Sequence, residues 1–145
     1  MVTVEREIKA SAEAIWNVLA DGWLYAAWVV GASRMRAVDP RWPAAGAVLH
    51  HSQGAWPVLL DDETVVKASV PQRELVLHGK ARPLGEVAIR VQLEPRPSGC
   101  LVILQEDAVG GPMALIPPLV RQLLIRPRNT EALRRLAYLA EGESR

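Results

Sequence analysis

The chain has 145 residues, 50% hydrophobic and 23% charged, which suits one compact domain over residues 1–145. Seventeen basic against sixteen acidic residues give a formal net charge of +1, so no strong field concentrates nucleic acid around the protein, and we expect no nucleic-acid partner. A single cysteine excludes an internal disulfide, and the start of the sequence shows no secretory signal. No apolar run reaches the roughly 20 residues of a membrane span. These features predict a cytoplasmic protein without stable membrane insertion.

The first thirty residues predict a strand followed by two short helices. Apolar and polar residues alternate over 2–9, which is typical of a half-buried strand. Ser11 stands where a helix N-cap is expected, and apolar residues then recur at helical spacing until Asp21-Gly22 ends the run. A second short helix is predicted over 23–30.

The middle of the chain predicts an antiparallel meander. Short apolar runs are separated by clusters of Pro, Gly and Asp, one of them Asp61-Asp62, and such clusters favour turns. The expected strands lie near 33–38, 46–53, 63–69, 73–81, 86–94 and 100–107.

Helical spacing returns after residue 112 and predicts a long C-terminal helix that ends near Glu141. Its expected buried stripe consists of Leu119, Leu123, Leu133, Leu136, Ala137 and Ala140. Pro127 predicts a break or kink near 126–129, because proline lacks the backbone N–H and clashes with the preceding turn.

This order of elements predicts an α+β fold. Strands and helices do not alternate as they do in a parallel sheet. We therefore expect a curved, seven-stranded antiparallel sheet, with two short helices after the first strand and the long helix laid across the concave face. A helix cannot touch every strand of a curved sheet, so a cavity is expected between them.

Several short motifs, in this order, carry a resemblance to a known family. They are Val4-Glu5-Arg6-Glu7-Ile8-Lys9-Ala10-Ser11 with Ala14-Ile15-Trp16, then His50-His51-Ser52 with Gly54 and Trp56-Pro57, then Glu106-Asp107 before Gly110-Gly111-Pro112, and finally Arg128-Asn129 through Leu133-Arg134-Arg135-Leu136. Over almost its whole length the chain resembles the SRPBCC proteins of the Bet v 1/START-like superfamily, including those of polyketide cyclase/dehydratase type. The resemblance implies a helix-grip fold with a deep cavity for apolar or amphipathic molecules.

The three histidines show no spacing typical of metal ligands, and we expect neither a metal nor another cofactor. His50 and His51 are neighbours on one predicted strand, so their side chains point to opposite faces. The match to the family's histidine before Ser-x-Gly favours His51 as the inward one. There it could act as a general base or hydrogen-bond a ligand carbonyl. The alternative is a structural histidine bonded to a strand neighbour.

Glu106 is the second candidate catalytic residue. It continues the alternation of Val102 and Leu104, so an inward apolar face places its carboxyl group in the cavity, where burial would favour a role as acid or base. The alternative is that Glu106 pairs with an arginine such as Arg128 and holds the C-terminal segment in place. Arg128 could instead bind an anionic head group.

Apolar and aromatic residues on the inward faces are candidate ligand contacts. The full set of ligand-binding candidates is Trp28, His51, Trp56, Leu77, Ile89, Val91, Met113, Leu119 and Leu123. Packing in the hydrophobic core is the alternative role for most of the apolar members.

The preferred hypothesis is binding of a small hydrophobic or amphipathic molecule, with transport of that molecule as an extension of the same role. The alternative is a polyketide cyclase/dehydratase-like enzyme that uses His51 and Glu106 for acid–base chemistry. A third hypothesis is an interaction module with an apolar groove for a partner's segment. The arginine-rich C-terminal region is either a solvated helix face or a weak docking site for an anionic membrane surface, and the sequence leaves a homodimer open.

Overall fold

The computed structural model describes residues 1–30, 32–55, 58–81 and 85–143 of the chain. Within these residues, seven strands form one antiparallel sheet in the order β1-β7-β6-β5-β4-β3-β2. The strands are β1 (Val2–Ile8), β2 (Ala32–Val38), β3 (Val48–Ala55), β4 (Val58–Val70), β5 (Glu74–Ala81), β6 (Gly85–Arg96) and β7 (Gly99–Gly110). Strands β2 to β7 pair in chain order and β1 pairs with β7, which confirms the predicted seven-stranded antiparallel sheet of an α+β fold.

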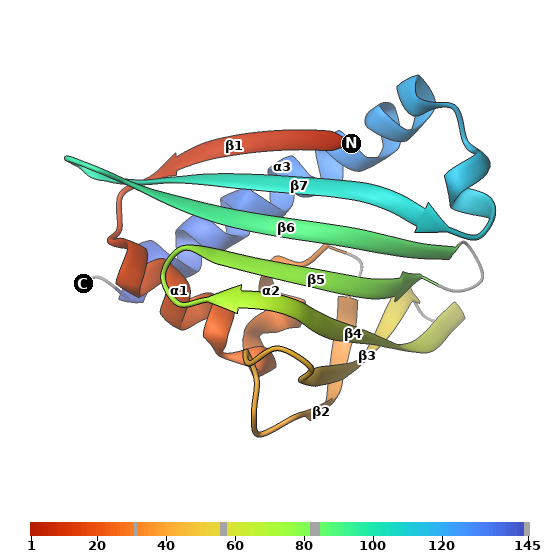
Figure 1. Ribbon diagram of the computed structural model, residues 1–145, viewed down its shortest axis with the longest axis horizontal. Helices are drawn as coiled ribbons and strands as arrows, with labels where there is room; N and C mark the ends of the chain where they lie inside the picture. Colours follow the sequence, from red (N-terminus) through yellow and green to blue (C-terminus); the bar gives the residue numbers. More distant parts are fainter. Residues whose placement is uncertain (31, 56–57, 82–84, 144–145) are drawn as a thin grey trace.

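The helices gather on one face of this sheet. After β1 come α1 (Ala12–Ala20), the short 3-10 helix η1 (Gly22–Leu24) and α2 (Tyr25–Trp28); after β7 come a second 3-10 helix, η2 (Pro112–Leu115), and α3 (Pro118–Glu143). Figure 1 shows α3 crossing behind β7 and β6, with α1 and α2 beside it. The predicted pair of short helices and the long C-terminal helix are confirmed.

Local sequence signals explain where α1 begins and which faces of the strands are buried. The Ser11 hydroxyl accepts a hydrogen bond from the Ala14 N–H at 3.1 Å, which satisfies one of the free donors at the helix start. On β6, Val87, Ile89 and Val91 are buried as their alternation predicts. They pack with residues of β7 and α3 in one core, so the inward face of the sheet is the face that α3 covers.

Strand β4 begins earlier than the sequence predicts. Asp61-Asp62 is not a turn, because both residues lie within β4 and pair with β3, Asp61 opposite Ser52 and Asp62 opposite His51. The Ser52 hydroxyl donates a hydrogen bond to Asp61 Oδ1 at 3.0 Å. A cross-strand partner therefore allows acidic residues in a strand that propensity alone disfavours.

The predicted break at Pro127 is wrong, since α3 continues as one helix from Pro118 to Glu143. Pro127 cannot donate to the carbonyl of Leu123, but both residues are exposed, so water can satisfy that carbonyl.

The predicted stripe of α3 is confirmed only in the second half of the helix. Leu133, Leu136, Ala137 and Ala140 are buried, whereas Leu119 and Leu123 are exposed. The first turns of α3 lie beyond the start of β1, as Figure 1 shows, so β1 does not cover them.

Candidate functional site

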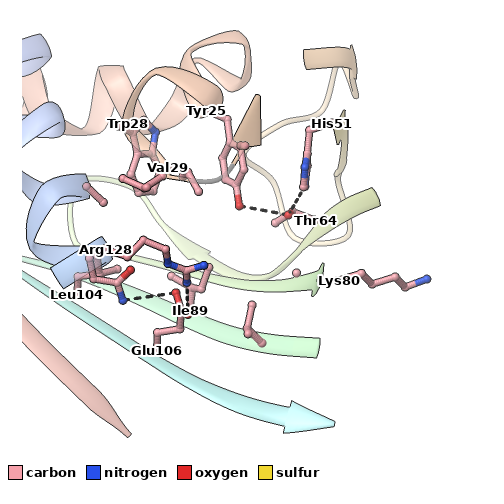
Figure 2. A pocket seen from close by; sticks show the side chains of 16 residues that line it. Tyr25, Trp28, Val29, His51, Thr64, Lys80, Ile89, Leu104, Glu106 and Arg128 are labelled. Carbon is pink, nitrogen blue, oxygen red and sulfur yellow. Dashed lines mark hydrogen bonds and ion pairs between the residues drawn. The ribbon is translucent and has the colours of Figure 1, made fainter. Parts of the chain in front are cut away.

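A pocket lies between α2, the middle of α3 and the concave face of the sheet (Figure 2). Its apolar walls include Trp28 and Val29 on the α2 side, Ile89 and Leu104 on the sheet, and Ala132 on α3. Polar side chains from β3, β4, β7 and α3 line the same space. The predicted cavity beneath the long helix is therefore present, but its lining is more polar than the sequence suggests.

The pocket is much smaller than the deep cavity that the family resemblance implies. The space open to a water-sized molecule is about 40 Å³, whereas sites for drug-sized ligands enclose roughly 300–1,000 Å³. Large side chains explain the difference, because Tyr25 and Trp28 project from α2 into the space below α3. Their rings contact each other edge to face with centroids 5.7 Å apart.

The first polar group of the pocket is a chain of three side chains. His51 Nε2 lies 2.9 Å from Thr64 Oγ1, and the Tyr25 hydroxyl lies 3.2 Å from the same oxygen. Burial raises the pKa of Tyr25 to about 12, so its hydroxyl keeps its proton at neutral pH. The threonine thus links α2 to β3 across the floor of the pocket.

His51 is buried and faces inward, as its match to the family motif predicts. Burial lowers the pKa of His51, and the nearby Asp62 carboxylate opposes this shift only in part. The imidazole is therefore neutral at pH 7 and able to accept a proton. Its Nδ1 atom is buried with no hydrogen-bond partner among the described residues, which is an uncommon and costly condition for a polar atom.

The second polar group joins α3 to the sheet. Glu106 on β7 is only 2% exposed, and its Oε2 accepts a charge-assisted hydrogen bond from Arg128 Nη2. Asn129 Nδ2 lies 3.4 Å from the other carboxylate oxygen. The predicted alternative, in which Glu106 pairs with Arg128 and holds the C-terminal segment, describes the observed contact.

The structure brings some of the predicted site residues together and separates others. Trp28, His51, Ile89 and Glu106 all line the pocket. Leu77 and Val91 are fully buried in the core without lining it.

The remaining candidates do not line the pocket either. Met113 is partly buried against the core, Leu119 and Leu123 are exposed on the outside of α3, and Trp56 lies outside the described residues.

Several lining residues were not among the predicted site residues, including the polar Thr64 and Asn129. No sequence signal marks Thr64, because its contact with His51 depends on how β3 and β4 pair. Asn129 is marked only by its place next to Arg128.

No group of three or more His, Cys, Asp or Glu side chains within the described ranges is arranged to hold a metal ion. The helices of that part of the chain are also too short or too polar to cross a bilayer.

The chain belongs to a known protein family. Residues 1–141 match the family described as "Polyketide cyclase / dehydrase and lipid transport", which is the SRPBCC-type family that the motifs indicate. No match was found among curated proteins.

Solved structures share this fold at low sequence identity. The di-domain ARO/CYC StfQ from the steffimycin biosynthetic pathway aligns with a TM-score of 0.73 and 12% identity, over 97% of this chain and 50% of that one. Protein MLL2253 from Mesorhizobium loti aligns with a TM-score of 0.71 and 18% identity, over 97% and 96% of the two chains. An uncharacterized protein from Rhizobium leguminosarum aligns with a TM-score of 0.74 and 15% identity, over 97% and 93%. This chain therefore spans half of the di-domain protein and nearly all of the other two.

Removing Arg128 tests the ion pair on which the position of α3 depends. We expect Arg128→Met to lower the free energy of unfolding by about 1–3 kcal/mol, because it leaves a buried carboxylate with one amide partner. Urea unfolding measures the loss. The matched control is Arg126→Met, because Arg126 is exposed and donates only to the Thr3 carbonyl at 3.3 Å; it should change stability by less than about 0.5 kcal/mol. Equal losses in the two variants would contradict the role of the pair.

The lowered pKa of His51 predicts a specific pH dependence. The unfolded chain takes up the proton near the ordinary pKa of 6.5 and the folded protein only at lower pH, so acid favours unfolding. The contribution of neutral His51 to the free energy of unfolding is complete above pH 6.5. It is lost as the pH falls through the pKa that His51 has in the folded protein. We expect stability to fall more between about pH 7 and pH 5 in the wild type than in His51→Gln. Parallel pH profiles from urea unfolding would contradict this prediction.

Proposed function

We propose that the protein binds a small hydrophobic or amphipathic molecule in the pocket between α2, α3 and the sheet. The observation that carries the proposal is the arrangement of two polar groups within apolar walls beneath α3. Burial of apolar ligand surface contributes about 25 cal/mol per Å², and a few fixed polar groups give orientation. Membership of a family that includes lipid transport supports the same proposal.

The two polar groups favour a ligand with oxygen atoms at separate positions. Arg128 is 35% exposed, so guanidinium N–H groups beyond those that bind Glu106 are within reach of a ligand carbonyl or carboxylate. Across the pocket, the hydroxyl groups of Thr64 and Tyr25 can donate or accept. An amphipathic molecule with oxygen at each end satisfies both groups, whereas a pure hydrocarbon leaves them unpaired.

A ligand larger than a few waters requires a wall of the pocket to move. The sheet side is held by continuous backbone pairing of β5, β6 and β7. The α2 side is a single helical turn of four residues, held to the sheet by the Tyr25–Thr64 contact at 3.2 Å. We infer that α2 is the wall that moves outward when a ligand enters, because fewer backbone hydrogen bonds restrain it.

A second candidate function is acid–base catalysis of the cyclase or dehydratase type. Its support is the buried, neutral His51 in the pocket and the likeness to a structure described as an ARO/CYC protein. Binding is preferred because Glu106 is already paired with Arg128 and His51 Nε2 is bonded to Thr64, so His51 Nδ1, which is buried, is the nitrogen of that ring without a partner among the described residues.

Obstructing the pocket tests the binding proposal. The probe is 1-anilinonaphthalene-8-sulfonate, an amphipathic dye that fluoresces in apolar sites. Ala132→Phe places a ring in the pocket and should weaken dye binding by about tenfold, or ~1.4 kcal/mol. The matched control is Ala27→Phe, the same change at an exposed position of α2, which should leave binding unchanged.

Two further variants complete this test. Ala132→Val adds less volume, so a partial loss remains readable if the phenylalanine variant unfolds. Leu119→Ser with Leu123→Ser removes exposed apolar side chains outside the pocket and should not affect dye binding. Retained binding in the folded Ala132 variants would refute the pocket as the binding site.

The His51→Gln variant separates binding from catalysis. A binding protein should retain dye affinity in this variant and show no turnover of linear polyketide-type substrates in either form. If the wild type instead turns over such a substrate and His51→Gln abolishes turnover while dye binding persists, the protein is an enzyme. High-performance liquid chromatography of the products gives this readout.

A further inference from the structure

Five exposed apolar side chains gather where η2 meets α3. We call this the η2–α3 surface; its members are Leu115 (86% exposed), Leu119 (73%), Leu123 (69%), Leu124 (62%) and Val120 (42%). Leucine side chains exposed together to this extent are uncommon on a protein surface and mark a site of interaction.

The members on α3 form one continuous face. At about 100° per residue, Leu119, Val120, Leu123 and Leu124 span an arc of roughly 140° on the helix. Arg126 borders this arc on one side and Arg121 on the other. A broad apolar arc between two arginines is the pattern of a helix that lies in a membrane interface.

The segment that carries the surface has only basic charged residues. No Asp or Glu occurs over residues 108–130, a stretch that contains Arg121, Arg126 and Arg128. Arg121 pairs with Asp107 at 3.1 Å and Arg128 with Glu106. Arg126 donates to the Thr3 carbonyl at 3.3 Å and has no ion pair among the described residues, so its guanidinium group is available to a phosphate.

We propose that the η2–α3 surface docks the protein on an anionic lipid bilayer. The leucines enter the boundary between head groups and acyl chains, while Arg126 binds lipid phosphates at the edge. The contact is peripheral and reversible, and it does not depend on which molecule the pocket binds.

A second copy of the chain fits this surface less well. A stable dimer buries about 800 Å² on each partner, or roughly 20–30 residues, whereas this surface is a projecting end with five apolar side chains. Two-fold pairing of this surface would also offer neither Arg126 a carboxylate from residues 108–130 of the other copy.

Strand register places this surface next to one end of the pocket. The end of β7 pairs with the start of β6, Gly110 opposite Glu86, and Glu86 pairs in turn with Lys80, which lines the pocket. Figure 1 shows η2 beyond the end of β7 at this side of the molecule. Docking would therefore bring that end of the pocket close to the lipid.

Vesicle co-sedimentation tests the proposal with the full chain. The probes are vesicles of phosphatidylcholine alone and of phosphatidylcholine with phosphatidylglycerol. We expect binding to the anionic vesicles, weaker binding at high salt, and little binding to the neutral ones. Leu119→Ser with Leu123→Ser should reduce binding to anionic vesicles by about tenfold, since apolar burial is lost.

Matched variants separate apolar from electrostatic contributions. Val70→Ser with Tyr138→Ser removes two other exposed side chains (47% and 79%) and should leave binding within about twofold of wild type. Arg126→Glu should remove most of the preference for anionic vesicles. Ala132→Phe should bind vesicles normally, which separates failure of docking from failure of the pocket proposal.

Two outcomes would overturn the proposal. One is the absence of binding to anionic vesicles, or binding that the Leu119/Leu123 variant leaves unchanged. The other is a wild-type dimer, detected by light scattering, that the same variant converts to a monomer without any vesicle binding; the surface is then an interface between copies.

Discussion

The burial of one carboxylate constrains the inner site of this protein. Glu106 faces inward because the alternation of β7 leaves it no other face, and a carboxylate at 2% exposure requires charged or hydrogen-bonding partners. Both partners, Arg128 and Asn129, come from α3. The ion pair therefore holds the middle of the long helix against β7 beside the pocket, together with the apolar side chains that α3 buries in the core.

The same constraint explains why the pocket is both small and polar. With α3 held close to β7, Tyr25 and Trp28 of α2 line the remaining space and narrow it. The Tyr25 hydroxyl then needs a partner in this dry interior and finds Thr64, which also bonds His51. Thr64 therefore joins the tyrosine of α2 to Nε2 of His51, while Nδ1 of His51 has no hydrogen-bond partner among the described residues.

Much of the fold follows from local sequence patterns, and the places where the structure differs from the prediction have physical causes. The alternation on β6 and the cap at Ser11 predicted their elements because each depends on the faces or dihedrals of a few residues. The length of β4 and the continuity of α3 across Pro127 could not be predicted in that way. Asp61 in β4 is stabilised by Ser52 on a neighbouring strand, and the lost hydrogen bond at Pro127 falls at an exposed position, where water can replace it.

The sequence by itself determined which side chains could face inward, since alternation along a strand has a fixed period. This alternation predicts that Glu106 faces inward, and the family motif makes the same prediction for His51. Only the tertiary structure decided what those residues meet. Thr64 reaches His51 through the pairing of β3 with β4, and Arg128 reaches Glu106 through the packing of α3, and neither contact leaves a signal in local sequence. The exposure of Leu119 and Leu123 was decided in the same way, because helical spacing defines an apolar stripe but only the extent of the sheet determines how much of it is covered.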